Sequence, residues 1–147
     1  MDVCYRRAQQ QDAEQIAILQ NEWTRENIIY GYQSEDVRSI VMKINEFSYI
    51  AECEGEVIGF VTASVHEAKQ IAVMRDGEQY LEIDDIYIDS EFRDRGIGSG
   101  LLETVLNEAH AKGIERSLVY SATKKLDGII DFYSRHGFKT WYVQMFK

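Results

Sequence analysis

The stretch from Tyr80 to Leu106 constrains the fold of this chain most, because three local patterns follow one another in it. An apolar-rich extended run over residues 80–88 predicts a strand, and a helical pattern with one apolar face begins near Leu101. Between them lies the basic, glycine-containing segment Arg93–Ser99. A strand that turns into a helix N-terminus presents unpaired backbone N–H groups, and glycines let the backbone approach a ligand. The sequence therefore predicts an anion site, of the kind that holds phosphate or diphosphate.

The length and charge of the chain narrow the classes of function. With 147 residues the chain is most simply one domain covering residues 1–147. The formal net charge of −9 argues against general nucleic-acid binding, which needs a basic surface. The same charge would attract a cationic substrate, although acidic residues also serve simply to keep a protein in solution.

Cysteine usage and the N-terminal residues favour a cytoplasmic protein. Cys4 and Cys53 lie in predicted strands without metal-binding spacing, which is typical of buried thiols in a reducing compartment. No basic segment followed by an apolar stretch marks a secretory signal, and no apolar run approaches the ~20 residues of a membrane helix. The lack of such a run predicts no membrane partner. His66, His110 and His136 show no metal spacing with one another, so we expect no metal.

The hydrophobic pattern predicts a mixed α/β (α+β) fold in the order β-α-α-β-β-β-α-β-α-β. Adjacent strands of the central meander should be antiparallel, and the strands around the third helix should be parallel. The expected strands are Val3–Arg7, Phe47–Glu54, Glu56–Val65, Tyr80–Ile88, Ser117–Ala122 and Phe138–Phe146. The expected helices begin at Asp12 (with Gln15 as capping-box partner), at Ser34, after the glycine segment, and near Asp127.

Two common phosphate-binding motifs do not fit the glycine segment. Dinucleotide-binding folds carry their glycines in the first strand–helix–strand unit, whereas this segment comes late, after three meander strands. A P-loop requires glycine, four residues and then Gly-Lys-Ser/Thr, which the chain lacks.

The string Arg93-Asp94-Arg95-Gly96-Ile97-Gly98, preceded by Ile86-Tyr87-Ile88, resembles the acetyl-CoA signature of the GCN5-related N-acetyltransferases (GNAT). The segment Asp131–Phe138 is similar to the Phe-Tyr-x-x-x-Gly-Phe segment of that family, and Arg6-Arg7-Ala8 with Asp12-Ala13 matches its opening more loosely. The resemblance covers most of the chain and implies a GNAT-like acyl-CoA N-acyltransferase fold. The family's asparagine shortly before the tyrosine is absent here, where the chain reads Lys125-Leu126-Asp127.

The resemblance implies acetyl-CoA as co-substrate. Backbone N–H groups of the glycine segment would hold the pyrophosphate. N–H groups of the preceding strand would bind the pantetheine arm and polarise the acetyl oxygen, which is the logic of an oxyanion hole. The implied cofactor-binding residues are Ile86, Tyr87, Ile88, Arg93, Asp94, Arg95, Gly96, Ile97, Gly98, Ser99 and Tyr133.

Acyl transfer to an amine needs a group that takes a proton, and the strand before the glycine segment carries three carboxylates. Glu82 matches the offset of the glutamate that is the base in some GNAT members, with Asp84 and Asp85 as substitutes. Strict alternation predicts that Glu82 and Asp84 share a face with Ile86 and Ile88, while Asp85 points to the other face. Alternatively, these carboxylates pair with arginines or bind the substrate cation.

Tyr133, by the resemblance, would protonate or hydrogen-bond the departing thiolate; the alternative is a core aromatic in a helix. Trp23, Tyr30 and Tyr32 would line an acceptor pocket or pack over the sheet.

The sequence therefore predicts an N-acetyltransferase that moves an acetyl group directly from acetyl-CoA to a primary amine, with a small-molecule acceptor favoured. A protein or peptide acceptor, another acyl donor, and a CoA-binding sensor without catalysis are the alternatives. A homodimer is compatible with the aromatic C-terminal segment, which predicts sheet core or a dimer edge.

Overall fold

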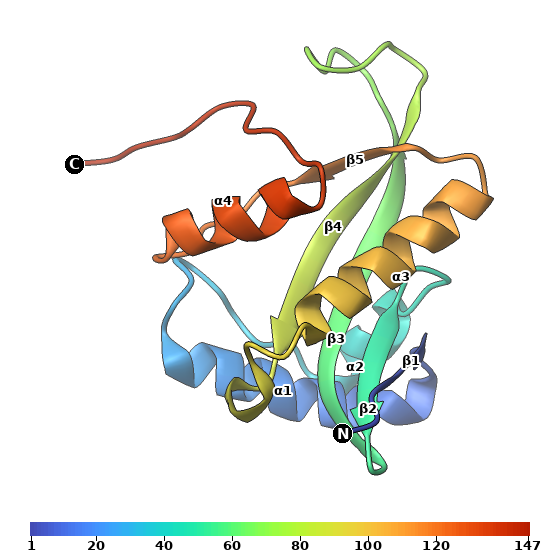
Figure 1. The fold of residues 1–147 in the computed structure, drawn as a ribbon, viewed down its shortest axis with the longest axis vertical. Coiled ribbons are helices and arrows are strands. Elements are labelled where there is room, and N and C mark those ends of the chain that lie inside the picture. Colours follow the sequence, from blue (N-terminus) through green and yellow to red (C-terminus); the bar gives the residue numbers. More distant parts are fainter.

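The computed structural model describes residues 1–147 and contains a five-stranded mixed sheet with helices on both faces (Figure 1). The strand order across the sheet is β1-β2-β3-β4-β5, antiparallel except for the parallel pair of β4 and β5. This mixed architecture confirms the predicted fold class. The strands are β1 (Cys4–Arg7), β2 (Tyr49–Cys53), β3 (Glu56–Glu67), β4 (Gln79–Ile88) and β5 (Arg116–Val119). The helices are α1 (Ala13–Glu26), α2 (Val37–Lys43), α3 (Ile97–Ala111) and α4 (Leu126–Arg135), with 3-10 helices η1 (Gln10–Asp12) and η2 (Ser90–Phe92).

Two hydrophobic clusters, one on each face of the sheet, hold these layers together. On one face α3 buries Leu101, Leu102 and Val105 completely, as its predicted apolar stripe requires. On the other face α1 packs Trp23 against Tyr87 and Phe60 of the sheet. A fully buried side chain of this size contributes about 1.5–3 kcal/mol, so both faces stabilise the sheet. None of the helices is both long and apolar enough to cross a membrane.

Gly100 shows how closely α3 lies on the sheet. A Cβ at this position would come within 2.2 Å of the Tyr5 ring on β1. Gly100, which follows the glycine segment, therefore allows this close packing, because a side chain there would force the Tyr5 ring or α3 to move.

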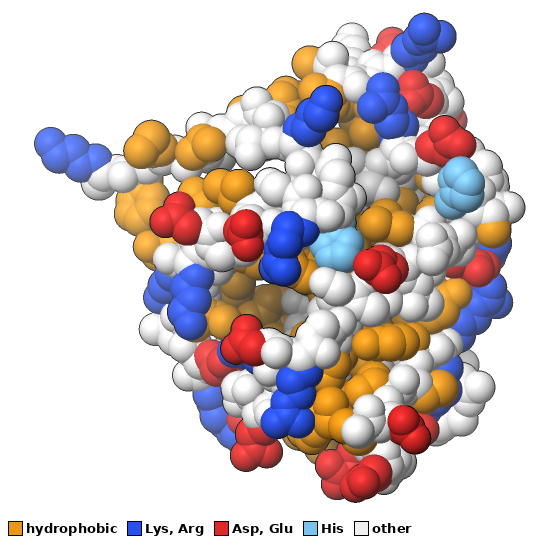
Figure 2. Space-filling view, in the orientation of Figure 1, with side chains coloured by type: hydrophobic (Ala, Val, Ile, Leu, Met, Phe, Trp, Pro, Cys, Tyr) orange, Lys and Arg blue, Asp and Glu red, His pale blue; other side chains and the backbone are white.

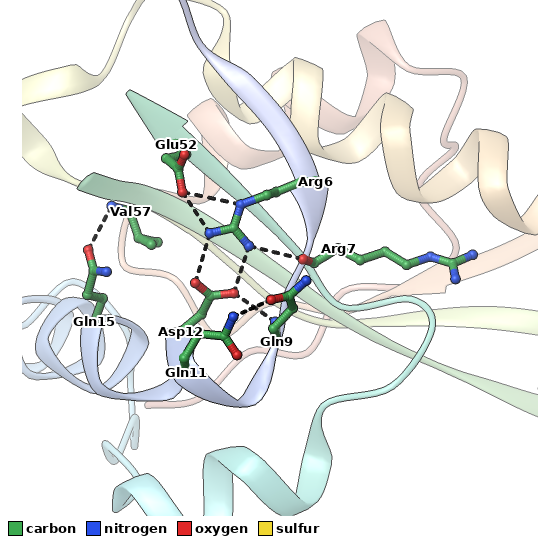
Figure 3. A network of polar contacts seen from close by, with 8 residues as sticks. All are labelled: Arg6, Arg7, Gln9, Gln11, Asp12, Gln15, Glu52 and Val57. Atoms are coloured by element: carbon green, nitrogen blue, oxygen red, sulfur yellow. Dashed lines mark hydrogen bonds and ion pairs between the residues drawn. The ribbon is translucent and has the colours of Figure 1, made fainter. Parts of the chain in front are cut away.

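The start of the first helical segment is fixed by Arg6 and by a capping box of Gln9 with Asp12 at the preceding η1 (Figure 3). Arg6 donates to both carboxylate oxygens of Asp12, each at 2.9 Å, and to Glu52 at 2.7 Å. Hydrogen bonding to Arg6 lowers the pKa of Asp12, which is only 2% exposed. Gln15 accepts instead from the backbone N–H of Val57 in β3. The predicted capping box of Asp12 with Gln15 is therefore wrong, because both side chains bind strands.

Two further sequence predictions differ from the structure. Asp36, not Ser34, caps α2, accepting from the backbone N–H of Ser39 at 2.8 Å. Residues 138–147 form no strand and extend away from α4 (Figure 1). Trp141 packs edge-on against Tyr142, and Phe146 against Tyr30. The aromatic-rich composition that predicted a strand here was insufficient, because a strand forms only where its backbone pairs with another strand, and this segment does not pair with β5, the edge strand of the sheet.

Candidate active site

Strand β4 changes its pairing half-way along its length. Residues Tyr80–Ile83 pair with β3 on one edge and with β5 on the other. The pairing with β5 ends at Ile83, whereas the pairing with β3 continues to Ile88. The chain after β5 turns instead to the segment that follows α1, where the N–H of Tyr30 bonds the carbonyl of Ala122 at 2.9 Å. One edge of β4 is therefore unpaired from Asp84 to Ile88.

This unpaired edge presents backbone donors. The N–H of Asp89 bonds the carbonyl of Ile58 on the β3 side. Because successive residues of an antiparallel ladder point to opposite edges, the N–H groups of Ile86 and Ile88 point away from β3. The Ile88 carbonyl on that edge accepts from Nε of Arg93 at 3.0 Å.

The glycine segment after β4 is a second set of free donors. None of the backbone N–H groups from Arg93 to Ser99 donates a hydrogen bond within the protein, and no side chain caps α3. Asp94 and Gly96 both have left-handed backbones, with φ of 60° and 77°. A concave run of N–H groups that ends at a helix N-terminus attracts anions. The backbone arrangement that the sequence predicted for this segment is thus present, with Ile97, Gly98 and Ser99 in the first turn of α3.

Arg93 itself turns back onto the protein. Its two terminal nitrogens donate to the two oxygens of Glu26, the last residue of α1, each at 2.6 Å. Tyr87 also donates its hydroxyl hydrogen to Glu26 at 2.5 Å, and the Arg93 guanidinium lies over the Tyr87 ring. Burial favours the neutral carboxyl, but these hydrogen bonds outweigh it and lower the pKa of Glu26. The side chain of Arg93 therefore ties β4 to α1, whereas Arg95 remains exposed.

Helix α4 covers the unpaired edge from the α3 side of the sheet. Tyr133 is 6% exposed and packs edge-on between Phe132 and Phe138. Burial raises the pKa of its phenol, so the hydroxyl keeps its proton. Nε2 of His136 lies 2.9 Å from the Ser99 hydroxyl, which joins the end of α4 to the first turn of α3. Figure 2 shows the surface hollowed between α4 and the loop after β4, with hydrophobic side chains in its depth.

The three carboxylates of β4 do not lie as strict alternation predicts. A β-bulge shifts the register so that Asp85 pairs with Thr62 and Ile83 with Ala63, which leaves Asp84 as the extra residue. Asp84 and Asp85 consequently line the same cavity. Ile86 and Ile88 pack with the cluster on the opposite face of the sheet. The prediction that Glu82 and Asp84 share a face with these isoleucines is therefore wrong, because Leu81 and Ile83 beside Glu82 also pack in that cluster and Glu82 lies beside His66 instead.

The cavity has a volume of about 390 Å³ and lies on the face of the sheet that α1 and α2 cover. The charged part of its lining is mostly acidic, with Glu35, Asp84 and Asp85 beside one lysine, Lys43, which forms an ion pair with Glu35. Burial, with the Glu35 and Asp84 carboxylates, raises the pKa of Asp85 to about 6. Asp85 accepts no hydrogen bond from another side chain or from the backbone.

Glu82, the first candidate for the base, lies beside this cavity rather than in its lining. Its carboxylate is 3.1 Å from Nε2 of His66. Trp23 and Tyr32 stack with ring centroids 4.2 Å apart, over Tyr87, so they pack over the sheet. No three acidic, histidine or cysteine side chains are grouped as metal ligands.

Comparison with known protein families identifies the family of this chain. The model of the acetyltransferase (GNAT) family matches residues 10–138. The chain belongs to the GNAT family. An uncharacterized N-acetyltransferase of Methanocaldococcus jannaschii is 30% identical over 91 residues, which are 62% of this chain and 38% of that protein. The matched part of the chain thus spans well under half the length of this relative.

Three solved structures share the fold. A ribosomal-protein-alanine N-acetyltransferase from Brucella melitensis has a TM-score of 0.73 at 16% identity, covering 100% of this chain and 99% of that one. A predicted acetyltransferase with acetyl-CoA from Clostridium acetobutylicum scores 0.72 at 17% identity, covering 98% and 96%. An aminoglycoside acetyltransferase from an uncultured soil metagenomic sample scores 0.74 at 16% identity, covering 100% and 98%. These likenesses establish the GNAT fold.

The donor set of this GNAT chain fits the co-substrate that the family implies. A diphosphate only accepts hydrogen bonds, and the N–H groups of Arg93–Ser99 have no acceptor within the protein. The N–H groups of Ile86 and Ile88 on the unpaired edge suit amide carbonyls of an extended arm, which would add to the sheet as a strand does.

Several residues of the site escaped the sequence reasoning. Glu26 binds Arg93 across 67 residues of sequence, so no local pattern marks it. Glu35 and Lys43 come to the cavity with α2 and the segment before it. Ser64 and His66 could have been found, because two polar residues at spacing two share one face of a predicted strand.

Proposed function

We propose that this chain transfers an acetyl group directly from acetyl-CoA to a primary amine of a small cationic molecule. Residues 1–147 act as one GNAT domain in this proposal. The observation that carries it is the divided strand β4, with unpaired backbone donors on one edge and an acidic cavity on one face beside the bulge. Cytoplasmic location and dimerisation stay predictions from the sequence.

The cofactor side works mainly through the backbone. The N–H groups of Arg93–Ser99 bind the diphosphate, and Arg95 adds a nearby positive charge. Bound acetyl-CoA supplies the thioester. An N–H group of the unpaired edge, from Ile86 or Ile88, donates to the acetyl oxygen, where negative charge develops during attack. Tyr87 contributes through its hydroxyl bond to Glu26, which fixes the end of β4.

The acceptor must lose a proton before it attacks. An alkylammonium with a pKa of about 10.4 is almost entirely protonated at pH 7, a penalty of roughly 4.6 kcal/mol. We assign the base to Asp85 rather than to Glu82, because Asp85 lines the cavity without a hydrogen-bond partner and its pKa is raised to about 6. A base whose pKa lies near the working pH is both deprotonated and basic enough to be useful.

Tyr133 serves the leaving group. Its buried phenol stays protonated at neutral pH, so it can donate a hydrogen bond to the thiolate as the carbon–sulfur bond breaks. Full proton transfer from a phenol to a thiolate is slightly uphill by ordinary pKa values, so the hydrogen bond is the main contribution.

The acidic cavity supports a cationic acceptor of modest size. Three carboxylates face one lysine that is already paired, which leaves an excess of negative charge for an ammonium group. The volume of about 390 Å³ suits a small molecule. One structural neighbour is an aminoglycoside acetyltransferase, whereas another is a ribosomal-protein-alanine N-acetyltransferase, so both classes belong in the test.

The test is thiol release from acetyl-CoA by the purified protein over a panel of diamines, polyamines, aminoglycosides and alanine-terminated peptides. The proposal predicts turnover with cationic small amines, and mass spectrometry should find one acetyl group on the product. Turnover with peptides alone would show that the acceptor is a peptide and not a small molecule. Tight CoA binding without turnover on any amine would favour a sensor, and a faster reaction with another acyl-CoA would replace the donor.

A further inference from the structure

His136 links the end of α4 to the first turn of α3, beside the free backbone donors of the glycine segment. Its Nε2 atom lies 2.9 Å from the Ser99 hydroxyl, and its Nδ1 atom lies 3.8 Å from a carboxylate oxygen of Glu103. Ser99 and Glu103 are one turn apart on α3, so the same side of this helix offers one group to each ring nitrogen. The imidazole side chain is only 11% exposed. The contact between Ser99 and His136 is therefore enclosed between the two helices.

Packing holds the imidazole in place as well. Phe132 lies one turn before His136 on α4, and the two rings have centroids 5.2 Å apart. The Phe132 ring also lies against the glycine segment, since a Cβ added to Gly98 would be 3.5 Å from it. The position of the imidazole is therefore fixed relative to the first turn of α3.

The Ser99 hydroxyl does not bind its own helix, as a hydroxyl inside a helix often does. Thr104, further along α3, donates its hydroxyl hydrogen to the carbonyl of Gly100, one turn earlier, at 2.7 Å. Ser99 has His136 as its side-chain partner instead, and its backbone N–H has no acceptor within the protein. The direction of the hydrogen bond between Ser99 and His136 therefore decides what the hydroxyl offers to an anion at the start of α3.

Glu103 determines this direction through Nδ1 of the ring. A bare Nδ1 would present its lone pair to the Glu103 carboxylate, so we expect Nδ1 to carry a hydrogen. Neutral His136 then has a bare Nε2, which accepts the Ser99 hydrogen and leaves only lone pairs of the hydroxyl for a ligand. The imidazolium carries hydrogens on both nitrogens. Its Nε2–H donates to the Ser99 oxygen, and the hydroxyl hydrogen becomes free for another acceptor.

We propose that His136 is a positioning residue that takes up a proton when CoA binds and thereby makes the Ser99 hydroxyl a donor to the diphosphate. This inference rests on the proposed function, which assigns the diphosphate to the glycine segment. Solvent supplies the proton to Nε2, and the O–H bond of Ser99 turns from His136 to a phosphate oxygen without breaking. The negative diphosphate favours the imidazolium, because a nearby opposite charge favours the charged form of a titratable group.

The charged groups around the ring suit this change. Glu103 of α3 forms the one ion pair of the imidazole, and its negative charge favours the imidazolium. On α4, Asp131 is paired with Arg135 at 3.5 Å. On β1, burial and the Glu103 carboxylate raise the pKa of the Tyr5 phenol, so Tyr5 stays neutral. Arg95 of the glycine segment is exposed to solvent.

The first test measures the dissociation constant of CoA by calorimetry from pH 6 to 8, without turnover. His136→Gln keeps an N–H donor near the position of Nε2 but cannot take up a proton. CoA binding should therefore weaken with rising pH about 10-fold more in the unsubstituted protein than in this variant. The 3′-phosphate of CoA titrates near pH 6 with both proteins, so the comparison removes its contribution. The control His110→Gln changes an exposed histidine on α3 and should keep the pH dependence of the unsubstituted protein.

The second test asks if His136 acts through the Ser99 hydroxyl. His136→Leu removes the donor, and we expect CoA binding at pH 6 to weaken about 10-fold. In the Ser99→Ala background the same substitution should have little further effect, because the hydroxyl that it orients is already absent.

Three results would contradict this account. The same pH dependence in the unsubstituted protein and in His136→Gln overturns the inference but leaves CoA as the co-substrate. Equal weakening by His136→Leu with and without the Ser99 hydroxyl assigns the imidazole to packing and also overturns it. Absence of CoA binding to the unsubstituted protein overturns the proposed function together with the inference. If His136→Leu does not fold, the pH dependence of His136→Gln decides alone.

Discussion

The two halves of β4 have nearly the same composition of apolar and acidic residues but opposite roles. The first half, ending at Ile83, is paired on both edges and buries Leu81 and Ile83 under α3. The second half, from Asp84 to Ile88, is paired on one edge and carries the cavity carboxylates and the free donors. A single extra residue at the bulge separates a structural segment from the segment to which we assign the chemistry. Stability and activity should therefore respond to different halves of the same strand.

The largest effect is expected at the start of the second half. Asp85→Asn removes the proposed base, and kcat/KM should fall by about 10²–10⁴-fold. In the unchanged protein kcat/KM should rise with pH through about 6, because Asp85 must lose its proton to act, and this limb should vanish in the variant. Asp131→Asn, which changes an exposed carboxylate on α4, is the matched control. Retained activity with the same pH limb would return the role to Glu82 or Asp84.

Asp85→Asn should also raise the thermal stability of the protein, whereas replacing a residue that stabilises the fold would lower it. The pKa of Asp85 is raised on folding, so the unfolded chain holds its Asp85 proton less tightly. The stabilising contribution is then complete below pH 4 and is lost as pH rises through about 6. Asp85→Asn should accordingly increase Tm at pH 8 but not at pH 4. An equal loss of Tm at both pH values would contradict the proposed environment of Asp85.

The first half should show the opposite behaviour. Leu81 is completely buried, so Leu81→Ala should lower the free energy of unfolding by about 2–5 kcal/mol. The Leu81→Ala molecules that remain folded should have the same KM values for acetyl-CoA and amine as the unsubstituted protein. Ile86 lies in the second half and is half-buried, so Ile86→Ala should lower the free energy of unfolding clearly less than Leu81→Ala does. Guanidinium denaturation of both variants measures the two losses. Equal losses at both positions would remove the energetic distinction between the two halves.

A smaller effect on turnover is expected from the helix that covers the unpaired edge. Tyr133→Phe keeps the buried ring but removes the proposed hydrogen bond to the thiolate. A hydrogen bond to a charged group contributes about 1.5–3 kcal/mol. The expected kcat is about 10–100-fold lower, with an unchanged circular dichroism spectrum. Tyr142→Phe changes an exposed phenol and serves as control. Unchanged turnover in Tyr133→Phe would leave Tyr133 as a core aromatic.

The smallest effect is expected where the second half is anchored to α1. Glu26→Gln removes the charge that holds Arg93, so the glycine segment should lose part of its preorganisation. Both side chains are partly exposed, and we expect the KM for acetyl-CoA to rise only about 5-fold, roughly 1 kcal/mol. The control Glu22→Gln changes an exposed glutamate on the same helix. A changed amine KM with an unchanged acetyl-CoA KM would place Glu26 on the acceptor side instead.

Much of this architecture could be predicted because it depends on local chemistry. The glycine segment after an apolar strand predicted the free donors, and the helix expected after this segment is α3. The apolar stripes of α1 and α3 likewise required only helical periodicity. The backbone part of the site was therefore readable from the sequence.

The side-chain part was not readable, because it depends on contacts between distant segments. The bulge at Asp84 is a property of the register between β3 and β4, and strict alternation therefore assigned Asp84 to the wrong face. Glu26 meets Arg93 only after α1 has packed on the sheet. The predicted final strand is wrong for a related reason: residues 138–147 are rich in aromatic residues, but they do not pair with the edge strand β5.

Backbone amide chemical shifts, recorded with and without saturating CoA, test the division of β4 most directly. The largest changes should fall on the N–H groups of Ile86, Ile88 and residues 93–99, while Leu81 and Ile83 in the first half stay unchanged. A cationic amine that is acetylated should then perturb Asp84 and Asp85. CoA-induced changes centred on the first half of β4, or absent from residues 93–99, would contradict the assignment of the cofactor to the unpaired edge and the glycine segment.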